Sequence, residues 1–307
     1  MSPRTRSVAL ATAAAAGGLD EDMLPLLAAL AARDLVACEA VWDDPAVDWG
    51  RFDAVVVRST WDYFARRDEF LGWARRVAAA TRLHNPAAVL EWTTDKRYLV
   101  DLDRAGVPVV PTVFLEPGEG GLLGKLGDLA EQDLIVKPAI SAGSNDTARH
   151  CRGERAAAAA HVGRLLAAGR PAMLQPYQAA VDEQGETALV FFDGQFSHAI
   201  RKGAIFARDP GGPDMVGGLF AREEIAPRQP SAAERRVADA TLAALRTRLP
   251  GVRQPLLYAR VDLVPLQDGT PAVLELELCE PSVFLDHSLG SAERFAAAIV
   301  HRLEEPR

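Results

Sequence analysis

The chain has 307 residues, of which 49% are hydrophobic and 25% are charged, and its formal net charge at pH 7 is −8. This composition is typical of a globular protein, and the length allows one multi-lobed unit or two to three subdomains. The acidic balance, without a broad basic stripe, argues against a nucleic-acid binder. The apolar run Val8–Ala16 is too short to span a membrane.

Two residue types are informative because they are rare. Three widely spaced cysteines stand in no paired motif, which indicates reduced thiols in a cytoplasmic protein. Lysine occurs four times, against thirty arginines. Each remaining lysine is therefore a candidate for a task that arginine does less well, such as placing a compact point charge at a phosphate.

The first third of the chain alternates strands and helices. The predicted elements are strand Ser7–Thr12, helix Asp20–Arg33, strand Val36–Trp42, strand Phe52–Arg58 and helix Asp68–Ala80. This rhythm predicts a small parallel sheet, whose ligand sites lie beyond the carboxyl ends of its strands. The segment after the third strand is therefore a candidate substrate loop, and it consists of Arg58, Ser59, Thr60, Trp61, Asp62 and Tyr63.

The rest of the chain mixes helices with hairpins. The middle part predicts helix Asp95–Ala105, strands Thr112–Leu115 and Leu134–Lys137, helix Gly153–Gly169 and strand Ala172–Gln175. Two hairpins follow, Thr187–Phe192 with Gln195–Lys202 and Leu256–Pro265 with Ala272–Leu278, and the helices are Ser231–Arg248 and Ser291–Arg302. We expect an α/β domain at 1–93, a central α+β lobe at 94–177 and an antiparallel lobe at 178–307. A cleft between the last two would be the natural ligand site.

A lysine and a loop of small residues follow one another after the strand Leu134–Lys137. Lys137 lies at the exit of an apolar strand, where an edge residue with a solvated ammonium is the simpler interpretation. The loop Ser141–Asp146 contains Ser141, Gly143 and Ser144, and its free backbone N–H groups can close over phosphates. The two features together favour a phosphate site.

Acidic residues gather on the second hairpin. Arg260 and Asp262 point to one face of their strand, and Glu275 and Glu277 share a face of the partner strand. Carboxylates that meet in this way repel one another unless a cation lies among them, and oxygen ligands suit Mg²⁺ together with nucleotide phosphates. Glu280 is a further candidate ligand, so the choice between Glu277 and Glu280 stays open.

In order and spacing, these residues resemble the ATP-grasp superfamily of ligases. The resemblance runs from about Thr94 to Ser282 and is carried by Lys96, Lys137-Pro138, Ser141–Asp146, Gln175–Gln178, Glu186, Arg260–Asp262 and Glu275–Glu277. It implies an ATP-grasp fold of α/β and α+β type, with an N-terminal parallel α/β domain and two lobes that enclose an ATP cleft. It also implies an ADP-forming carbon–nitrogen ligase, which activates a carboxylate as an acyl phosphate before an amine attacks.

The resemblance also implies the role of each matching residue. Lys96, Lys137 and the loop residues Ser141, Gly143 and Ser144 would bind phosphates; Gln175, Pro176, Tyr177 and Gln178 would meet adenine; Glu186 would hold the ribose. Asp262, Glu275 and Glu277 would ligate two Mg²⁺ ions, and Arg260, Arg201 and Lys137 would form the catalytic set. The loop Ser141–Asp146 and the segment Ala207–Gly218 would act as lids that keep water from the acyl phosphate.

Two segments, Arg58–Tyr63 and Glu275–Ser282, are similar to the branch of the cycloserine-forming O-ureido-D-serine cyclo-ligases. This likeness implies an amino-acid-like substrate, a role in antibiotic biosynthesis and substrate contacts by Arg58, Ser59, Thr60, Trp61, Asp62, Glu280 and Ser282. The commonest pattern has Asn where Glu277 stands. A homodimer is suggested by the resemblance alone.

Three alternatives remain. An ATP-grasp ligase that makes a dipeptide or an amino-acid amide would differ mainly in its loops. A non-catalytic ATP-binding module is disfavoured because Lys96, Lys137, Asp262 and Glu275 are all present. A dinucleotide-binding oxidoreductase is disfavoured because Ala11–Gly18 lacks the G-x-G-x-x-G fingerprint.

Overall fold

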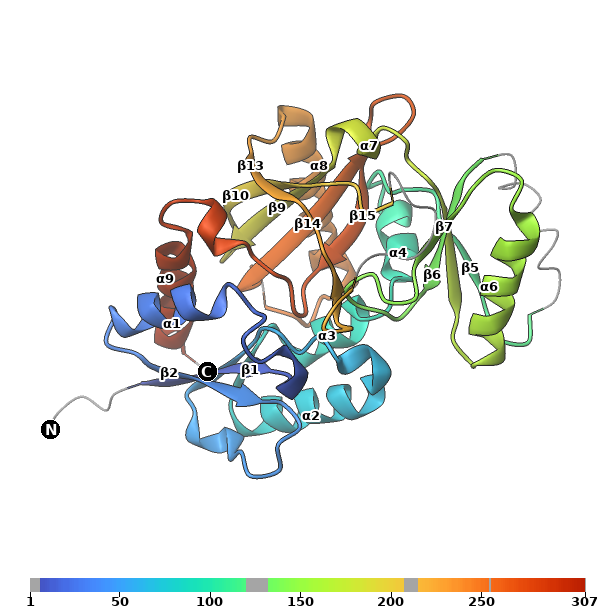
Figure 1. Cartoon of the computed structure of the whole chain (residues 1–307). Helices are drawn as coiled ribbons and strands as arrows, with labels where there is room; N and C mark the ends of the chain where they lie inside the picture. Colours follow the sequence, from blue (N-terminus) through green and yellow to red (C-terminus); the bar gives the residue numbers. More distant parts are fainter. Residues whose placement is uncertain (1–5, 120–131, 207–214, 254, 307) are drawn as a thin grey trace, which may run out of the picture.

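The computed structural model describes residues 6–119, 132–206, 215–253 and 255–306, whose strands form three main sheets (Figure 1). The N-terminal sheet is parallel, as the sequence predicted, and its strand order is β2-β1-β3-β4. Its strands are β1 (Ser7–Thr12), β2 (Val36–Val41), β3 (Ala54–Val57) and β4 (Arg82–His84), and its helices are α1 (Met23–Ala31), α2 (Arg67–Ala80) and α3 (Ala87–Thr93). The sequence did not predict β4 and α3, which are short.

The central lobe is an antiparallel sheet in the order β5-β8-β6-β7, with α6 packed on it (Figure 1). Its elements are α4 (Tyr98–Arg104), β5 (Val113–Leu115), β6 (Leu134–Pro138), β7 (Ala148–His150), α6 (Arg155–Ala167) and β8 (Ala172–Pro176). A small apolar core between sheet and helix contains Leu115, Val136, Val162, Leu165 and Leu174. The helix face of this sheet is therefore filled, which leaves the other face for ligands.

The C-terminal lobe is a five-stranded sheet in the order β13-β10-β9-β14-β15. Its elements are α7 (Val181–Gln184), β9 (Glu186–Phe192), β10 (Gln195–Lys202), β13 (Ile225–Arg228), α8 (Ala232–Arg248), β14 (Tyr258–Pro265) and β15 (Pro271–Glu277), with the small pair β11 (Met215–Val216) and β12 (Phe220–Ala221) before β13. Both predicted hairpins are confirmed, and Asp193 and Gly194 have the positive φ values, 50° and 74°, that a type I′ turn requires.

The hairpin of β14 and β15 contains a β-bulge. Asp262 lies opposite Glu275, whereas the next residue of β14, Leu263, lies opposite Val273, so Leu274 is the extra residue on β15. Residues opposite each other point to the same face of a sheet. The pairing of Asp262 with Glu275, and of Arg260 with Glu277, therefore places all four charged side chains on one face.

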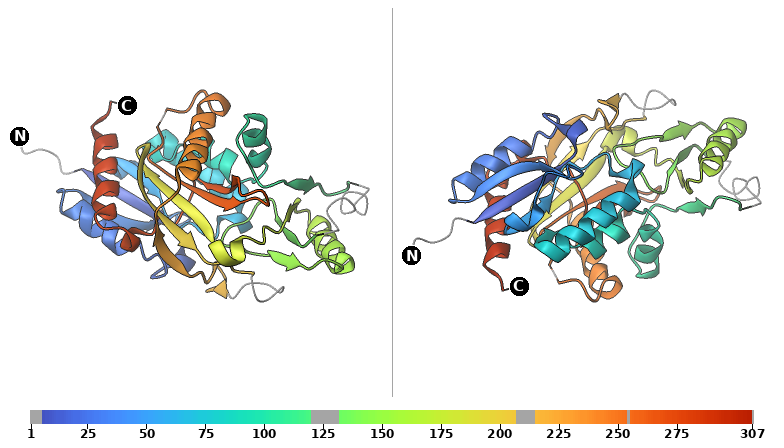
Figure 2. Two further views of the ribbon diagram at one scale, coloured as in Figure 1. Left: turned by 90° about the horizontal axis from the view of Figure 1, so that it is seen from above. Right: turned by 90° about the horizontal axis from the view of Figure 1, so that it is seen from below.

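The C-terminal helix α9 (Ser291–Glu304) returns to the N-terminal sheet. It packs beside α1, as Figures 1 and 2 show, and Phe295 joins a core cluster with Val8, Leu10 and Tyr258. In the part of the chain that the structure describes, the connections contain four short 3₁₀ helices: η1 (Ala14–Ala16), η2 (Trp49–Arg51), η3 (Tyr63–Ala65) and η4 (Leu285–His287). The N-terminal and C-terminal parts therefore share one core, while the central lobe has a core of its own.

Each sheet falls within one of the units that we propose at 1–93, 94–177 and 178–307. Of the expected lid Ala207–Gly218, residues 207–214 lie outside the described residues, and the remainder contains β11 and a turn. Among the helices that the structure describes, none is both long and apolar enough to cross a membrane.

Candidate active site

A cavity of about 580 Å³ lies where the three parts of the chain meet. Most residues predicted for the site line this cavity: Trp61, Lys96, Lys137, Ser141, Gly143, Ser144, Gln175, Pro176, Tyr177, Gln178, Glu186, Arg260, Glu275, Glu277, Glu280 and Ser282. Asp262 lies directly beneath, 2% exposed and bonded to Arg260. Segments far apart in the sequence thus converge as the ordered motifs predicted.

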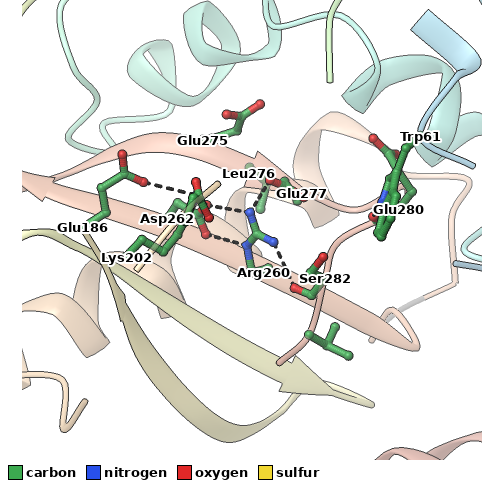
Figure 3. Close-up of polar contacts among 12 residues, drawn as sticks. Trp61, Glu186, Lys202, Arg260, Asp262, Glu275, Leu276, Glu277, Glu280 and Ser282 are labelled. Carbon is green, nitrogen blue, oxygen red and sulfur yellow. Dashed lines mark hydrogen bonds and ion pairs between the residues drawn. The ribbon is translucent and has the colours of Figure 1, made fainter. Parts of the chain in front are cut away.

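Lys202 is the main residue that the sequence analysis missed. Its ammonium lies 3.4 Å from both Glu186 and Asp262 (Figure 3). It also lies 3.1 Å from Glu223. The position opposite Glu186 on the paired strand places Lys202 on the cavity face. The rarity of lysine and the strand pairing were the signals that could have identified it.

Arg201 does not reach the cavity, which corrects the prediction that it contacts phosphate or a substrate carboxylate. Strand alternation turns its side chain to the face opposite that of Lys202. There the guanidinium donates to the carbonyl of Gln184 at 3.0 Å and to that of Glu183 at 3.3 Å. Arg201 therefore holds the turn before β9.

Arg260 is at the centre of a dense charge network (Figure 3). Its Nε and Nη2 donate to the two oxygens of Asp262, each at 2.8 Å, and Nη2 also donates to Glu277. Its Nη1 donates to the carbonyl of Ser282 at 2.9 Å. The guanidinium is thereby fixed at the point where the β14–β15 carboxylates meet the cavity.

The carboxylates of this network compete for the same cations. Burial raises the pKa of Asp262, but Arg260 and Lys202 outweigh burial and keep it below its usual value. Burial opposes ionisation of Glu275 as well, yet the nearby lysines lower its pKa to about 2. For Glu277, burial dominates and the neighbouring carboxylates add to it, which raises its pKa to about 8. Negative charge here exceeds what the protein's own cations satisfy, as at a cation-binding site.

Two further lysines approach from the central lobe. Lys96 donates to the carbonyl of Ser141 at 2.6 Å and lies 3.1 Å from Glu275, so it links the small-residue loop to β15. Burial lowers the pKa of Lys137, and the neighbouring Lys96 and Lys202 lower it further against the opposing charge of Glu275. A buried ammonium with such neighbours favours an anion beside it.

The loop Ser141–Asp146 depends on a glycine. Gly143 has φ +59°, and a Cβ there would lie 2.0 Å from the carbonyl oxygen of Leu219. The amide of Ala221 on β12 donates to the Gly143 carbonyl at 3.0 Å. Backbone contact this close is open only to glycine. It joins the loop to residues 219–221, which directly follow the second predicted lid.

Gln175 presents an acceptor without a partner. Thr112 donates its single hydroxyl proton to the carbonyl of Val110 at 2.7 Å, so it can only accept from Gln175 Nε2, 3.0 Å away. This fixes the orientation of the amide. Gln175 Oε1 is then buried, with no donor among the described residues, and its residue lines the cavity. A ligand N–H at this point would satisfy it.

Only part of the predicted substrate loop reaches the cavity. Trp61 lines it, packs edge-on against Phe220 at 5.1 Å and donates from Nε1 to the carbonyl of Glu280 at 3.1 Å. Arg58, Ser59, Thr60 and Asp62 do not line it. The first three are at most 1% exposed, and Asp62 accepts bonds from Trp42 and Arg66. The pattern located the loop but could not tell its buried supports from the tryptophan that lines the cavity.

Among the residues that the structure describes, no three His, Cys, Asp or Glu side chains are arranged to enclose a metal ion by themselves. The paired carboxylates of β14 and β15 provide only oxygen atoms, the ligands that Mg²⁺ prefers. Mg²⁺ is commonly held by one or two carboxylates together with substrate phosphates and water. The donor set therefore fits a cation that arrives with a nucleotide.

An antiparallel lobe facing a five-stranded lobe, with lysines from one and carboxylates from the other in a shared cavity, defines an ATP-grasp ligase. Comparisons agree. Residues 8–85 match the family model described as the N-terminal domain of D-cycloserine synthetase DcsG. The chain is 44% identical over 301 residues to the cycloserine biosynthesis protein DcsG of Streptomyces lavendulae, covering 97% of this chain and 99% of that protein.

Solved structures give the same result. The crystal structure of D-cycloserine synthetase DcsG superimposes with a TM-score of 0.89 at 43% identity, covering 97% of this chain and 100% of that one. A D-alanine–D-alanine ligase from Bacillus anthracis, complexed with ATP, has a TM-score of 0.63 at 12% identity, covering 97% of each chain, and supports the fold alone. The chain belongs to the DcsG family of ATP-grasp ligases and is an ADP-forming carbon–nitrogen ligase.

Proposed function

We propose that this ligase closes a cycloserine-type ring in an O-substituted D-serine, such as O-ureido-D-serine, at the expense of ATP. The observation that carries the proposal is the register of β14 and β15. It aligns Arg260 with Glu277 and Asp262 with Glu275, opposite the buried lysines of the central lobe. The 44% identity to a cycloserine biosynthesis protein supports the choice of product.

The nucleotide would lie between the central and C-terminal lobes. Gln175 Oε1 would accept from the amino group of adenine, since it is the buried acceptor that lacks a donor. Glu186 would hold the ribose, and Lys96 and Lys137 would neutralise the phosphates as point charges. A guanine base would present an oxygen to Gln175 instead, so the site would favour ATP over GTP.

Two Mg²⁺ ions would be held by Asp262, Glu275 and Glu277 together with phosphate oxygens, and they would offset the charge on the transferring phosphoryl group. Lys202 would share this task, because its ammonium already lies among three carboxylates and can turn toward an anion. Whether Glu280 also takes part stays a prediction.

The reaction would proceed in two displacements. A carboxylate oxygen of the substrate attacks the γ-phosphorus, and ADP leaves. The nitrogen bonded to the side-chain oxygen then attacks the acyl carbon, phosphate leaves, and the N–H proton passes to solvent. With O-ureido-D-serine, water afterwards removes the carbamoyl group as carbon dioxide and ammonia. Arg260 would place an N–H donor at the oxygen that becomes negative in the second step.

The experiment is a product assay with the purified chain, ATP and Mg²⁺. O-substituted D-serines are compared with D-serine plus free amines, and ADP and the organic product are quantified together. The proposal expects one ADP per cyclised product without an added amine. ADP formation that requires two amino acids would support a dipeptide ligase instead. The matched control is Asp262→Asn, which keeps the shape of the side chain but removes its charge.

A further inference from the structure

The wall of the cavity at the substrate end is a short segment after β15, residues Ser282–Leu285, which we call the strap. It carries backbone strain, because Phe284 has φ +51°, a left-handed conformation that is unfavourable for a residue with a side chain. Such a conformation persists only where surrounding contacts hold it. The contacts that hold the strap come from the opposite end of the chain.

Asp22, in the N-terminal domain, accepts three consecutive backbone N–H groups of the strap. Its Oδ2 accepts from Val283 at 2.6 Å and from Phe284 at 3.2 Å, and its Oδ1 accepts from Leu285 at 2.6 Å. The carboxylate is 4% exposed. Its counter-ion is Arg58 Nη2 at 3.3 Å. A buried carboxylate whose two oxygens both accept hydrogen bonds from one segment fixes the position of that segment tightly.

The strap in turn holds Arg260. The carbonyl of Ser282 accepts from Arg260 Nη1, and the Phe284 ring lies 5.4 Å from the guanidinium carbon. Arginine has five N–H donors. Four are bonded here, to Asp262, Glu277 and Ser282. Within the described contacts, the donor left for a ligand is therefore the second N–H of Nη1, and the Ser282 carbonyl sets its direction.

We infer that Asp22 is a positioning residue for ligation: it fixes the strap, and through the Ser282 carbonyl it aims the free N–H of Arg260 at the reacting carboxyl group. Asp22 need not touch the substrate to do so. The inference rests on the role proposed above for Arg260. It also gives the N-terminal domain a role in the reaction, because without Asp22 the strap, which belongs to the C-terminal lobe, would no longer be held in place.

The test is Asp22→Asn, an isosteric change that leaves an NH₂ group facing a backbone N–H of the strap. We expect the kcat for ADP-forming ligation to fall about 10- to 100-fold and the KM for the amino-acid substrate to rise, since misplacement of about 1 Å can cost that much. Affinity for Mg²⁺·ADP, measured by calorimetry, should stay within about twofold of the unmodified chain, because the nucleotide end does not depend on the strap.

The matched control is Asp53→Asn. Asp53 is another aspartate of the N-terminal domain, and its Oδ2 accepts the backbone N–H of Ser7 at 2.8 Å, away from the cavity. It should lose comparable stability without loss of kcat. If Asp22→Asn does not fold, Arg58→Met replaces it, because that variant keeps the carboxylate but removes its cation, and a several-fold fall in kcat alone is expected.

Two results would overturn the inference. One is a folded variant whose kcat equals that of Asp53→Asn. The other is an equal loss of ADP affinity and kcat, which would mark Asp22 as a general structural support. Both outcomes leave the proposed function standing, provided that the unmodified chain turns over its substrate. Failure of the unmodified chain to cyclise any O-substituted D-serine would defeat the proposed function instead.

Discussion

The two ends of the cavity are built in opposite ways. At the nucleotide end, two polar groups have surroundings that a ligand would complete. Lys137 is a buried cation near other cations, and Gln175 Oε1 is a buried acceptor with no donor among the described residues. At the substrate end, the backbone groups of the strap are already bonded, because Asp22 accepts its N–H groups and Arg260 donates to its Ser282 carbonyl. One end is completed by its ligand, and the other is organised before any ligand arrives.

This difference separates affinity from rate. An unpaired buried group destabilises the free protein, and that cost is recovered when the ligand binds. A hydrogen-bond network that is already formed in the free protein needs no reorganisation during the reaction, so it stabilises the transition state. Changes at the nucleotide end should therefore mainly alter nucleotide binding, and changes at the substrate end should mainly alter turnover.

The largest effect is expected where the two ends meet. Lys202→Met removes the cation shared by Glu186, Glu223 and Asp262, and it should lower kcat about 1,000-fold. Arg201→Met, its neighbour on β10, should change kcat less than about twofold, since its guanidinium faces away. Steady-state ADP release measures both. Equal losses in the two variants would contradict the assignment of faces on this strand.

Lys137→Met should break the nucleotide end alone. We expect kcat/KM for ATP to fall about 100-fold, because one phosphate-neutralising charge is lost. Without nucleotide the variant should melt no earlier than the unmodified chain, since a desolvated ammonium among like charges is replaced by an apolar side chain. Thermal melting with and without Mg²⁺·ADP measures this. A lower melting temperature of the free variant would show that Lys137 supports the fold.

Thr112→Val should loosen base selection. Without the hydroxyl, the Gln175 amide is no longer held in one orientation and can present its NH₂ to a guanine oxygen. The preference for ATP over GTP in kcat/KM should fall about tenfold, whereas Thr112→Ser should retain it. An unchanged preference would show that another group selects the base.

Trp61→Phe is expected to have the smallest effect. It removes the bond from Nε1 to the Glu280 carbonyl but keeps a ring against Phe220. One such hydrogen bond contributes about 1 kcal/mol, so KM for the amino-acid substrate should rise about two- to fivefold. KM for ATP should not change, and a change there would show that the two ends are coupled through Trp61.

The sequence predicted the fold well, because its signals were local. Hairpin turns and apolar strands each indicate one element, and the structure assembles these elements into the three sheets. The short β4 and α3 were missed because three and seven residues carry little periodicity. The suggested homodimer remains a prediction.

Residues that line the cavity were identified where ordered motifs contain them, and they were missed where three-dimensional pairing decides which side chain faces the cavity. Lys202 and Arg201 are adjacent, and only the register against Glu186 tells which one enters the cavity. Asp22 carries no motif, and its partners lie 261 to 263 residues away along the chain. A contact between the two ends of a chain leaves no local pattern, so no reading of Asp22 in isolation could have found it.

The extra residue of the β-bulge, Leu274, lets β15 present both an apolar and an anionic side chain to the cavity. Regular alternation would turn Leu274 away from the face that carries Glu275, yet both line the cavity. The bulge thereby places the apolar side chain of Leu274 beside the carboxylate of Glu275 on the same face of β15. Removing Leu274 would leave Val273 paired with Leu263 on the core side of the sheet, and it would take away the apolar side chain that lies beside Glu275 in the cavity.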